Sequence, residues 1–234
     1  MSDSPAALET AHNPQLRHHF SDMEQQTQAS TFGMWLFLAT EIMFFGGMFL
    51  AYLVYRYWYY DEFAAGSRSI DIWLGTINTA VLICSSLTVA LGVKAAQLGK
   101  QKLLVFLLSL TMLFGLAFLA IKGLEWYDKY EEHHVPGYSF SAADLIEKYP
   151  QLHIDPRPEQ IYFSLYFAMT GLHALHMIVG LGIFSFLLYK AIRGTYGPDY
   201  HTPVEIGGLY WHFVDIVWIY LFPLLYLIDR KPLR

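Results

Sequence analysis

Charged residues are scarce in this chain. Asp, Glu, Lys and Arg make up 15% of its 234 residues, whereas a soluble domain carries about 25%. Together with a hydrophobic share of 55%, this deficit indicates a membrane protein. The formal net charge of −5 does not suit a nucleic-acid partner, which clustered basic residues would attract, so we expect none.

Cysteine is nearly absent as well. The single residue, Cys84, cannot form a disulfide within the chain and lacks the companions of a zinc or iron–sulfur site. It lies in an apolar run, so we expect a small buried hydrophobic side chain there. The sequence also has no glycine-rich phosphate loop, no His-Glu-x-x-His motif and no serine in a triad context. We therefore predict no catalytic residues.

Long apolar stretches are what the chain has instead. Five of them reach about twenty residues, the length that spans a bilayer as a helix. Helices are required there because lipid cannot satisfy an open backbone. The sequence therefore predicts an all-α integral membrane protein, a bundle of five transmembrane helices. Their expected positions are about 31–60, 70–96, 103–127, 160–192 and 205–228.

The segments outside these helices suggest the domain organisation. Residues 1–30 are polar and lack the basic start and short apolar core of a signal peptide. We expect a polar N-terminal segment there, followed by one transmembrane domain over residues 31–234. The connections 61–69 and 97–102 are short and polar, which predicts that the first three helices are antiparallel neighbours.

Two ionisable residues lie inside the last apolar stretch, within the motif YWHFVDIVW at 210–218. An ionisable side chain at that depth costs about 2.5–3.5 kcal/mol to insert, so it needs a partner. His212 and Asp215 are three residues apart, on one helix face, where each can satisfy the other. Trp218 lies on a neighbouring stripe. The pattern predicts a helix that faces protein rather than lipid.

A glutamate, Glu41, lies about ten residues into the first expected helix, and its neighbours one turn away are Phe and Leu. Apolar surroundings favour the neutral form of a carboxyl. Two interpretations stay open. The carboxyl is hydrogen-bonded across a helix interface, to Asn78 or Thr79, or it handles protons or binds lipid.

Two further polar pairs lie on helix faces. Lys122 and Glu125 are spaced for a structural ion pair, with Lys122 extending toward the membrane interface. His173 and His176 share a face of the fourth expected helix, and with His212 they form a candidate haem or copper ligand set. No second helix repeats the histidine pair, so we favour hydrogen-bonded interface histidines and predict no metal site.

Five motifs occur in order along the chain: LATEIMFF at 38–45, NT at 78–79 followed by SS at 85–86, EWY at 125–127, TGLHALH at 170–176, and YWHFVDIVW at 210–218. Together they resemble subunit III of the haem–copper oxidases, the cytochrome c and quinol oxidase family. The resemblance covers most of residues 31–229. Leu172 and Ala174 stand where the family more commonly has Phe and Gly.

The resemblance implies a subunit without redox centres in a proton-pumping terminal oxidase of aerobic respiration, which reduces oxygen to water. Haems and copper are expected in partner subunits, so no cofactor is expected in this chain. It implies direct contact with oxidase subunit I, beside subunit II and other respiratory-complex subunits. The chain would stabilise the catalytic subunit and support proton uptake or oxygen access. Glu41 matches the family carboxyl that reacts with carbodiimides, which implies a proton or lipid role.

The resemblance also implies a location. It places the chain in the bacterial cytoplasmic (inner) membrane with a cytoplasmic N-terminus, although a raw count of Lys and Arg favours the opposite orientation. The mitochondrial type has seven helices, and we expect this chain to lack the first two. Family members hold phospholipid in a cleft that those two helices help to form, so their expected absence removes part of that cleft. Phospholipid stays a candidate ligand. The contact with subunit I is expected on the face bearing His212, Asp215 and Trp218, or on the first two helices.

Three alternatives stay open. The homologous accessory protein of nitric oxide reductase shares these motifs, so only the partner distinguishes it. A haem-binding membrane cytochrome would use His173 or His176 with His212 and would show a Soret band. An independent proton channel centred on Glu41 would conduct protons as an isolated chain. The motifs do not distinguish cytochrome c from quinol as the electron donor of the oxidase.

Overall fold

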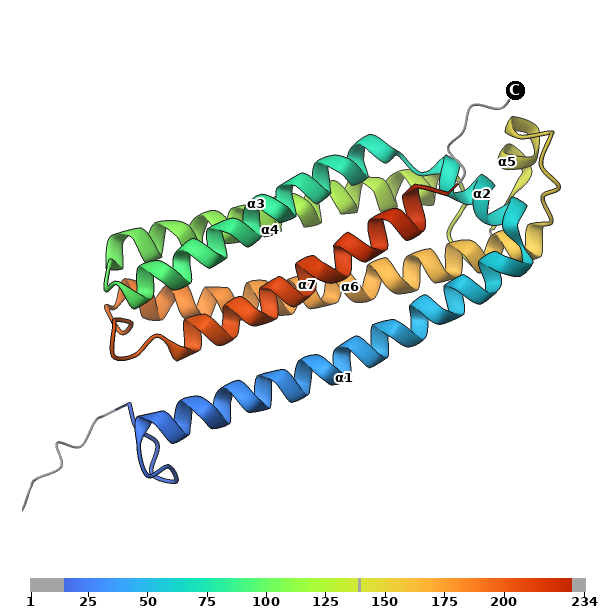
Figure 1. Ribbon diagram of the computed structural model, residues 1–234. Helices are drawn as coiled ribbons and strands as arrows, with labels where there is room; N and C mark the ends of the chain where they lie inside the picture. Colours follow the sequence, from blue (N-terminus) through green and yellow to red (C-terminus); the bar gives the residue numbers. More distant parts are fainter. Residues whose placement is uncertain (1–14, 139, 229–234) are drawn as a thin grey trace, which may run out of the picture.

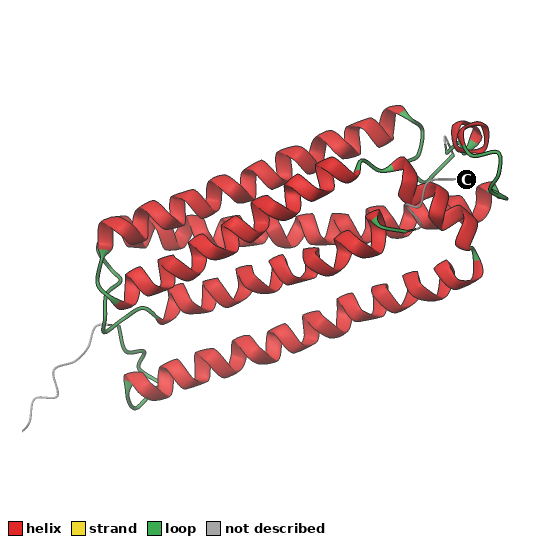
Figure 2. Ribbon diagram, turned by 45° about the horizontal axis from the view of Figure 1, so that its top comes forward, coloured by secondary structure: helices red, strands yellow, loops and turns green. Residues whose placement is uncertain are grey.

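The computed structural model describes residues 15–138 and 140–228, and its long elements there are all helices. These are α1 (Met23–Trp58), α2 (Tyr60–Ser69), α3 (Ile72–Gln97), α4 (Gln101–Glu131), α5 (Ala143–Lys148), α6 (Pro156–Ile192) and α7 (Thr202–Tyr226). The long helices run side by side, with loops at their ends (Figures 1 and 2). Five are long and apolar enough to cross a membrane. The predicted all-α bundle of five transmembrane helices is thus confirmed.

The first long helix begins at Met23 rather than at about residue 31. Asp22 caps it, because its Oδ1 accepts a hydrogen bond from the backbone N–H of Gln25 at 2.7 Å. That bond, with a second from the Ser21 hydroxyl, holds the pKa of the Asp22 carboxyl below its usual value. The helix therefore extends into the expected polar segment 1–30, of which residues 1–14 lie outside the described residues.

A tight turn joins α3 to α4. It requires a positive φ of 67° at Gly99, a conformation that glycine adopts without steric cost. The N–H of Gly99 donates to the Ala96 carbonyl and that of Lys100 to the Ala95 carbonyl, at 3.0 and 2.9 Å. These bonds satisfy carbonyls at the end of α3. The turn folds α4 back along α3 as an antiparallel pair, as the short connection predicts.

The first helix is not a neighbour of α3. Within the described ranges α1 contacts α2, α6 and α7 but not α3, and α7 lies between α1 and α3 (Figure 1). The prediction that the first three helices are neighbours is therefore wrong for this pair. Residues 61–69, expected to be a simple polar connection, belong to α2, whose residues 62–67 are buried and which packs against α6. This extra helix separates the end of α1 from the start of α3.

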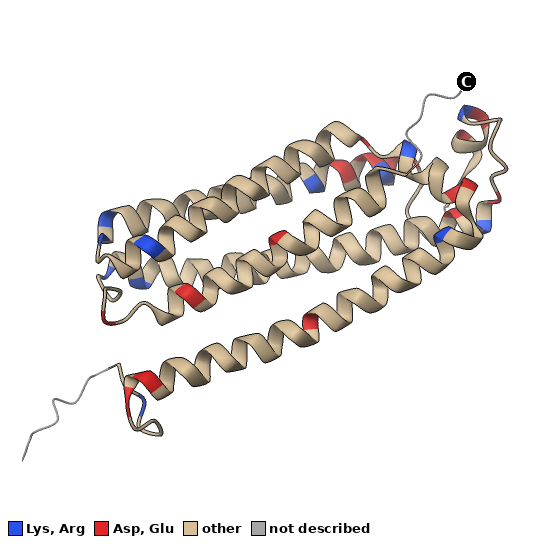
Figure 3. Cartoon of the chain, viewed as in Figure 1, with Lys and Arg blue, Asp and Glu red and all other residues tan. Residues whose placement is uncertain are grey.

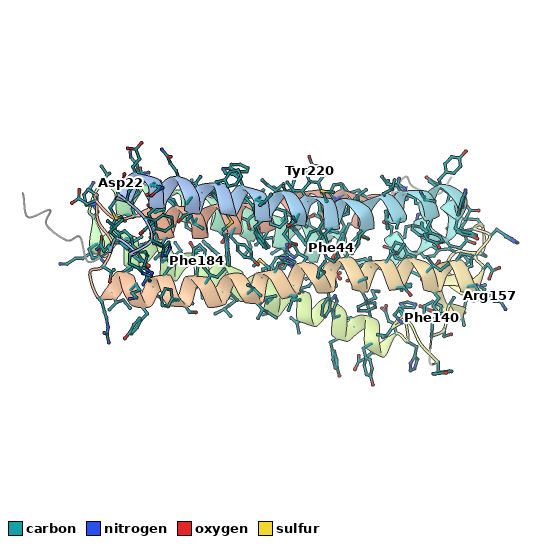
Figure 4. The ribbon with its side chains drawn as sticks, turned by 90° about the horizontal axis from the view of Figure 1, so that it is seen from below. Asp22, Phe44, Phe140, Arg157, Phe184 and Tyr220 are labelled. Atoms are coloured by element: carbon teal, nitrogen blue, oxygen red, sulfur yellow. The ribbon has the colours of Figure 1, made fainter. Side chains whose placement is uncertain are left out.

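The last helix, α7, is the one most enclosed by the others. In its most apolar 18-residue window 56% of the residues are buried, compared with 17% in α1. Trp211 packs so closely on Gly115 of α4 and Gly180 of α6 that an added Cβ would approach its indole to 2.8 and 3.0 Å. Phe184 fills the interior, whereas Tyr220 lies at the outer surface (Figure 4). The prediction that this helix faces protein is confirmed.

The outer face of α3 carries Cys84. The thiol is exposed rather than buried, so the prediction of a buried side chain was wrong. Ile83 and Leu87 on the same face are 54% and 60% exposed. Lipid is as apolar as a protein interior, so an apolar sequence within a membrane helix does not specify whether a side chain faces protein or lipid.

Candidate functional site

Charged residues gather toward the two ends of the bundle, and few lie in the middle of the long helices (Figure 3). Three sets of polar groups inside the bundle contain most of the predicted site residues. We call Lys122, Glu125, Tyr166 and Tyr226 the Lys122 cluster; Glu41 and His176 the Glu41–His176 pair; and Ser86, His212 and Asp215 the α7 polar patch.

The Lys122 cluster joins α4, α6 and α7. Lys122 is only 2% exposed, so the expectation that it extends toward the membrane interface was wrong. Its Nζ donates to Glu125 Oε1 at 2.9 Å, to the Tyr166 hydroxyl at 3.0 Å and to the Tyr226 hydroxyl at 2.6 Å. All three ammonium donors are therefore used inside the protein.

The two tyrosines complete the Lys122 cluster. Their hydroxyls each donate to Oε1 of Glu125, Tyr166 at 2.5 Å and Tyr226 at 2.6 Å. The same oxygen thus accepts three hydrogen bonds, and the Trp218 ring lies 5.3 Å from the Lys122 ammonium. The other carboxyl oxygen of Glu125, Oε2, is buried without a partner in the described ranges. The three hydrogen bonds to Oε1 compensate part of the desolvation of the ion pair. The predicted ion pair is present, and it fixes three helices to one another.

The Glu41–His176 pair joins α1 to α6. Oε2 of Glu41 lies 3.1 Å from Nε2 of His176. The expectation of a bond from Glu41 to Asn78 or Thr79 was wrong, because α1 does not contact α3. Thr79 instead bonds within its own helix and accepts from Trp218, and the buried amide of Asn78 has no partner in the described part of the chain.

The hydrogen bonds of His176 define its protonation. Its Nδ1 lies 2.9 Å from the Leu172 carbonyl, which can only accept, so Nδ1 carries a proton. The contact between Nε2 and Glu41 then needs one proton as well, held either by the imidazole or by the carboxyl. The carboxyl and the imidazole therefore share one proton across this contact. Both side chains are partly exposed: 14% of the His176 side chain and 19% of the Glu41 side chain is accessible.

His173 lies deeper in the bundle and bonds a different group. Its Nε2 donates to the Val214 carbonyl of α7 at 3.1 Å, and its ring contacts Phe118 and Trp218. His173 and His176 are thus hydrogen-bonded at helix interfaces, as the sequence predicts. Among the residues that the structure describes, no three His, Cys, Asp or Glu side chains come together as a metal site.

The α7 polar patch lies between α3 and α7. His212 and Asp215 share a face, but they do not bond each other as predicted. Nδ1 of His212 lies 2.7 Å from Oγ of Ser86. Asp215 is 3% exposed, and among the described residues the Ser86 hydroxyl is the donor near its carboxyl, although its geometry falls short of a good hydrogen bond. The imidazole is turned toward α3 because Ser86 offers it a partner there.

The tryptophans of α7 explain part of the packing against α3. Trp211 Nε1 donates to Ser85 Oγ at 2.8 Å, and Trp218 Nε1 donates to Thr79 Oγ1 at 3.0 Å. Both indoles are fully buried. Trp218 therefore points into the bundle, and it does not contribute to the outward face on which the contact with subunit I was expected.

Sequence reasoning missed the partners that make these sets complete. Tyr166, Tyr226 and Ser86 each supply the hydroxyl that bonds a predicted residue. A hydroxyl within an apolar helix requires a hydrogen-bond partner, and that signal was available in the sequence. It also missed Glu159 near the start of α6, which is fully buried with both oxygens unpartnered in the described ranges.

The fold and these buried polar sets define a class: a multi-pass membrane protein whose mid-membrane polar residues join its own helices. The model of the cytochrome c oxidase subunit III family matches residues 156–229, which include α6 and α7. The chain is 34% identical over 196 residues to a probable cytochrome c oxidase subunit 3 of Nocardia farcinica, covering 84% of this chain and 86% of that protein. The chain belongs to the cytochrome c oxidase subunit III family.

Animal relatives match over a similar length. Cytochrome c oxidase subunit 3 of Gadus morhua is 30% identical over 207 residues, 83% of this chain and 68% of that protein. The Gallus gallus protein of the same name is 29% identical with the same coverage. The similarity therefore extends well beyond the two helices that the family model matches.

Proposed function

We propose that this chain is a non-catalytic subunit III of a proton-pumping aerobic terminal oxidase, where it stabilises the catalytic subunit. The observation that carries the proposal is the similarity to the Nocardia farcinica protein over most of both chains. The Lys122 cluster is consistent with a non-catalytic subunit, because its charged groups bond to one another and hold helices of this chain together. Haems and copper are expected in partner subunits, and phospholipid is a candidate ligand of this chain.

The proposed location is the bacterial cytoplasmic membrane, with the N-terminus in the cytoplasm. The bacterial relative supports the membrane type. The orientation is proposed from the family resemblance. Six basic residues lie toward the end of the bundle where α1 begins, namely Arg17, Lys94, Lys100, Lys102, Lys190 and Arg193. At the other end Lys122 and Lys129 are buried and bonded to Glu125 and Glu132, so they do not count as loop charges. Arg56, Arg68, Lys148 and Arg157 remain there, and the sequence adds Arg230, Lys231 and Arg234 after α7, so the basic residues alone do not decide the orientation.

The Glu41–His176 pair is proposed to support proton uptake by the oxidase. A carboxyl and an imidazole that share one proton can accept a second proton and release it again. The pair lies at the interface of α1 with α6, with each side chain partly exposed. It would act as a proton antenna beside the catalytic subunit and would take no part in electron transfer.

The test is purification of the chain from its native membrane in mild detergent, with an optical spectrum and mass identification of what accompanies it. We expect haem absorbance and a large catalytic oxidase subunit. Nitric oxide reductase subunits, or a colourless chain without partners, would overturn the proposal. A Soret band that stays with the isolated chain would favour the haem-binding cytochrome instead.

A further inference from the structure

The imidazole of His134, in the segment between α4 and α5, is held between two carboxylates. Its Nδ1 lies 3.1 Å from Oε2 of Glu132, and its Nε2 lies 3.1 Å from Oδ1 of Asp144. The side chain of His134 is only 1% exposed, whereas those of Glu132 and Asp144 are 46% and 52% exposed. His134 is therefore a buried ring with an acceptor at each of its nitrogens.

This arrangement determines how many protons the ring carries. A carboxylate accepts hydrogen bonds and cannot donate them, so each of the two contacts needs a proton on the ring nitrogen. A neutral imidazole has only one such proton, so it can bond Glu132 or Asp144 but not both. The two contacts together require the doubly protonated, positively charged form of His134. When one proton is lost, a nitrogen lone pair faces a carboxylate and that contact becomes repulsive.

The contact with Asp144 connects α5 to the rest of the chain. Asp144 lies in the first turn of α5, which lies at the end of the bundle beside α2 (Figure 1). Leu145 is the one buried residue of this six-residue helix, so little apolar contact holds it in place. The His134 ring is itself fixed, because it stacks on Phe163 of α6 with the ring centroids 4.6 Å apart. The bond from His134 is thus a main attachment of α5.

Other charged groups come from the elements around this contact. Lys129, near the end of α4, donates a hydrogen bond to Glu132. Glu159 of α6 interacts electrostatically with Asp144 and with Glu62 of α2. Four carboxyls and one ammonium therefore lie around α5 and the imidazole, so a positive charge on the ring has acidic groups to balance it.

We propose that His134 is a proton-dependent latch, which holds α5 against the bundle while both ring nitrogens are protonated and releases α5 when rising pH removes one proton. Closing the latch takes up a proton, so acid favours the closed form and a higher pH favours the open form. The meaning of the latch rests on the proposed function. In the proposed orientation α5 lies on the outer face of the membrane, toward which a proton-pumping oxidase releases protons, so proton release would close the latch.

Hydrogen exchange tests the latch on the full chain, purified in mild detergent with whatever subunits accompany it. Peptides covering residues 142–149 are followed between about pH 5 and about pH 8, the range in which a histidine loses its charge. Each rate is divided by the intrinsic exchange rate at that pH. We expect the protection of these amides to fall about tenfold as the pH rises, the factor that loss of one charge-assisted hydrogen bond gives. Protection that stays constant, or that increases with pH, would overturn the proposal.

Substitutions identify the titrating group. His134→Phe keeps a ring that can stack on Phe163 but removes both donors, and His153→Phe is the matched control at an exposed histidine of the same segment. We expect the pH dependence to disappear in His134→Phe and to remain in His153→Phe. Asp144→Asn removes one of the two negative charges at the ring, so opening should move to a lower pH. An unchanged pH dependence in His134→Phe would assign the titration to another group and contradict the proposal.

The latch and the proposed function fail in different ways. If no oxidase subunit accompanies the chain, the proposed function fails, while the exchange of the chain alone still decides whether the latch exists. If an oxidase subunit is present and the protection of α5 does not depend on pH, only the latch fails.

Discussion

Glu125 and Asp215 are carboxyls in membrane-spanning helices, exposed by only 2% and 3%. Oε1 of Glu125 accepts hydrogen bonds from Lys122, Tyr166 and Tyr226. Among the described residues, the donor near the carboxyl of Asp215 is the Ser86 hydroxyl, and its geometry falls short of a good hydrogen bond. The difference indicates that Glu125 holds helices of this chain together through its hydrogen bonds, whereas Asp215 contributes much less to holding them.

The largest effect is expected from breaking the ion pair of the Lys122 cluster. Glu125→Leu leaves the ammonium of Lys122 buried without its counter-charge, and we expect the chain to lose about 3–5 kcal/mol of stability. Thermal unfolding of the purified chain in detergent measures this. The double variant Lys122→Met with Glu125→Leu should recover most of the loss. If the single and double variants were equally unstable, the packing volume rather than the charge would be the cause.

A smaller effect is expected from removing one hydroxyl of the same cluster. Tyr226→Phe takes one donor from Glu125 and one acceptor from Lys122, which should cost about 1–3 kcal/mol because both groups are buried. Denaturant unfolding in detergent measures it. Tyr220→Phe is the matched control on the same helix, since Tyr220 is 61% exposed, and it should leave the stability unchanged. An equal loss in both variants contradicts this account.

The contribution of the Glu41–His176 pair to stability should lie between those of Glu125 and Asp215, because the pair is hydrogen-bonded but partly exposed. A double-mutant cycle with Glu41→Leu and His176→Leu should give a coupling energy of about 0.6–1.7 kcal/mol, the range of hydrogen bonds between membrane helices. Unfolding of the two single variants and the double variant measures it. Strict additivity would mean that the pair contributes nothing to holding α1 against α6.

The smallest effect is expected at Asp215 in the isolated chain. Asp215 has only the Ser86 hydroxyl as a nearby donor. Replacing it with an aliphatic side chain of similar size removes a desolvation cost, so Asp215→Leu should change stability by less than about 1 kcal/mol or increase it. Its unfolding, measured beside that of Glu125→Leu, contrasts the two regions most directly. A loss as large as that of Glu125→Leu would contradict the difference between them.

The residues that sequence analysis singled out fall at helix interfaces, but their partners were predicted only in part. The i, i+3 spacing predicts the bond between Lys122 and Glu125 correctly, because both residues lie on one helix face. The same spacing is wrong for His212 and Asp215, because Ser86 on another helix is the closer partner of the imidazole. Local spacing decides a contact only when no other helix offers a competing one.

The sequence by itself determined the helices. Apolar segments of this length must satisfy their backbone hydrogen bonds within lipid, and only helices do so here, so the number of spans could be predicted from the sequence. The family motifs could also be recognised without knowledge of the fold. Only the tertiary structure decided which helices meet. Lipid and protein interiors are equally apolar, so hydrophobicity does not specify which face of a helix packs and which faces lipid. That choice depends on close packing at Gly115 and Gly180 and on hydrogen bonds between helices, which exist only once the helices are assembled.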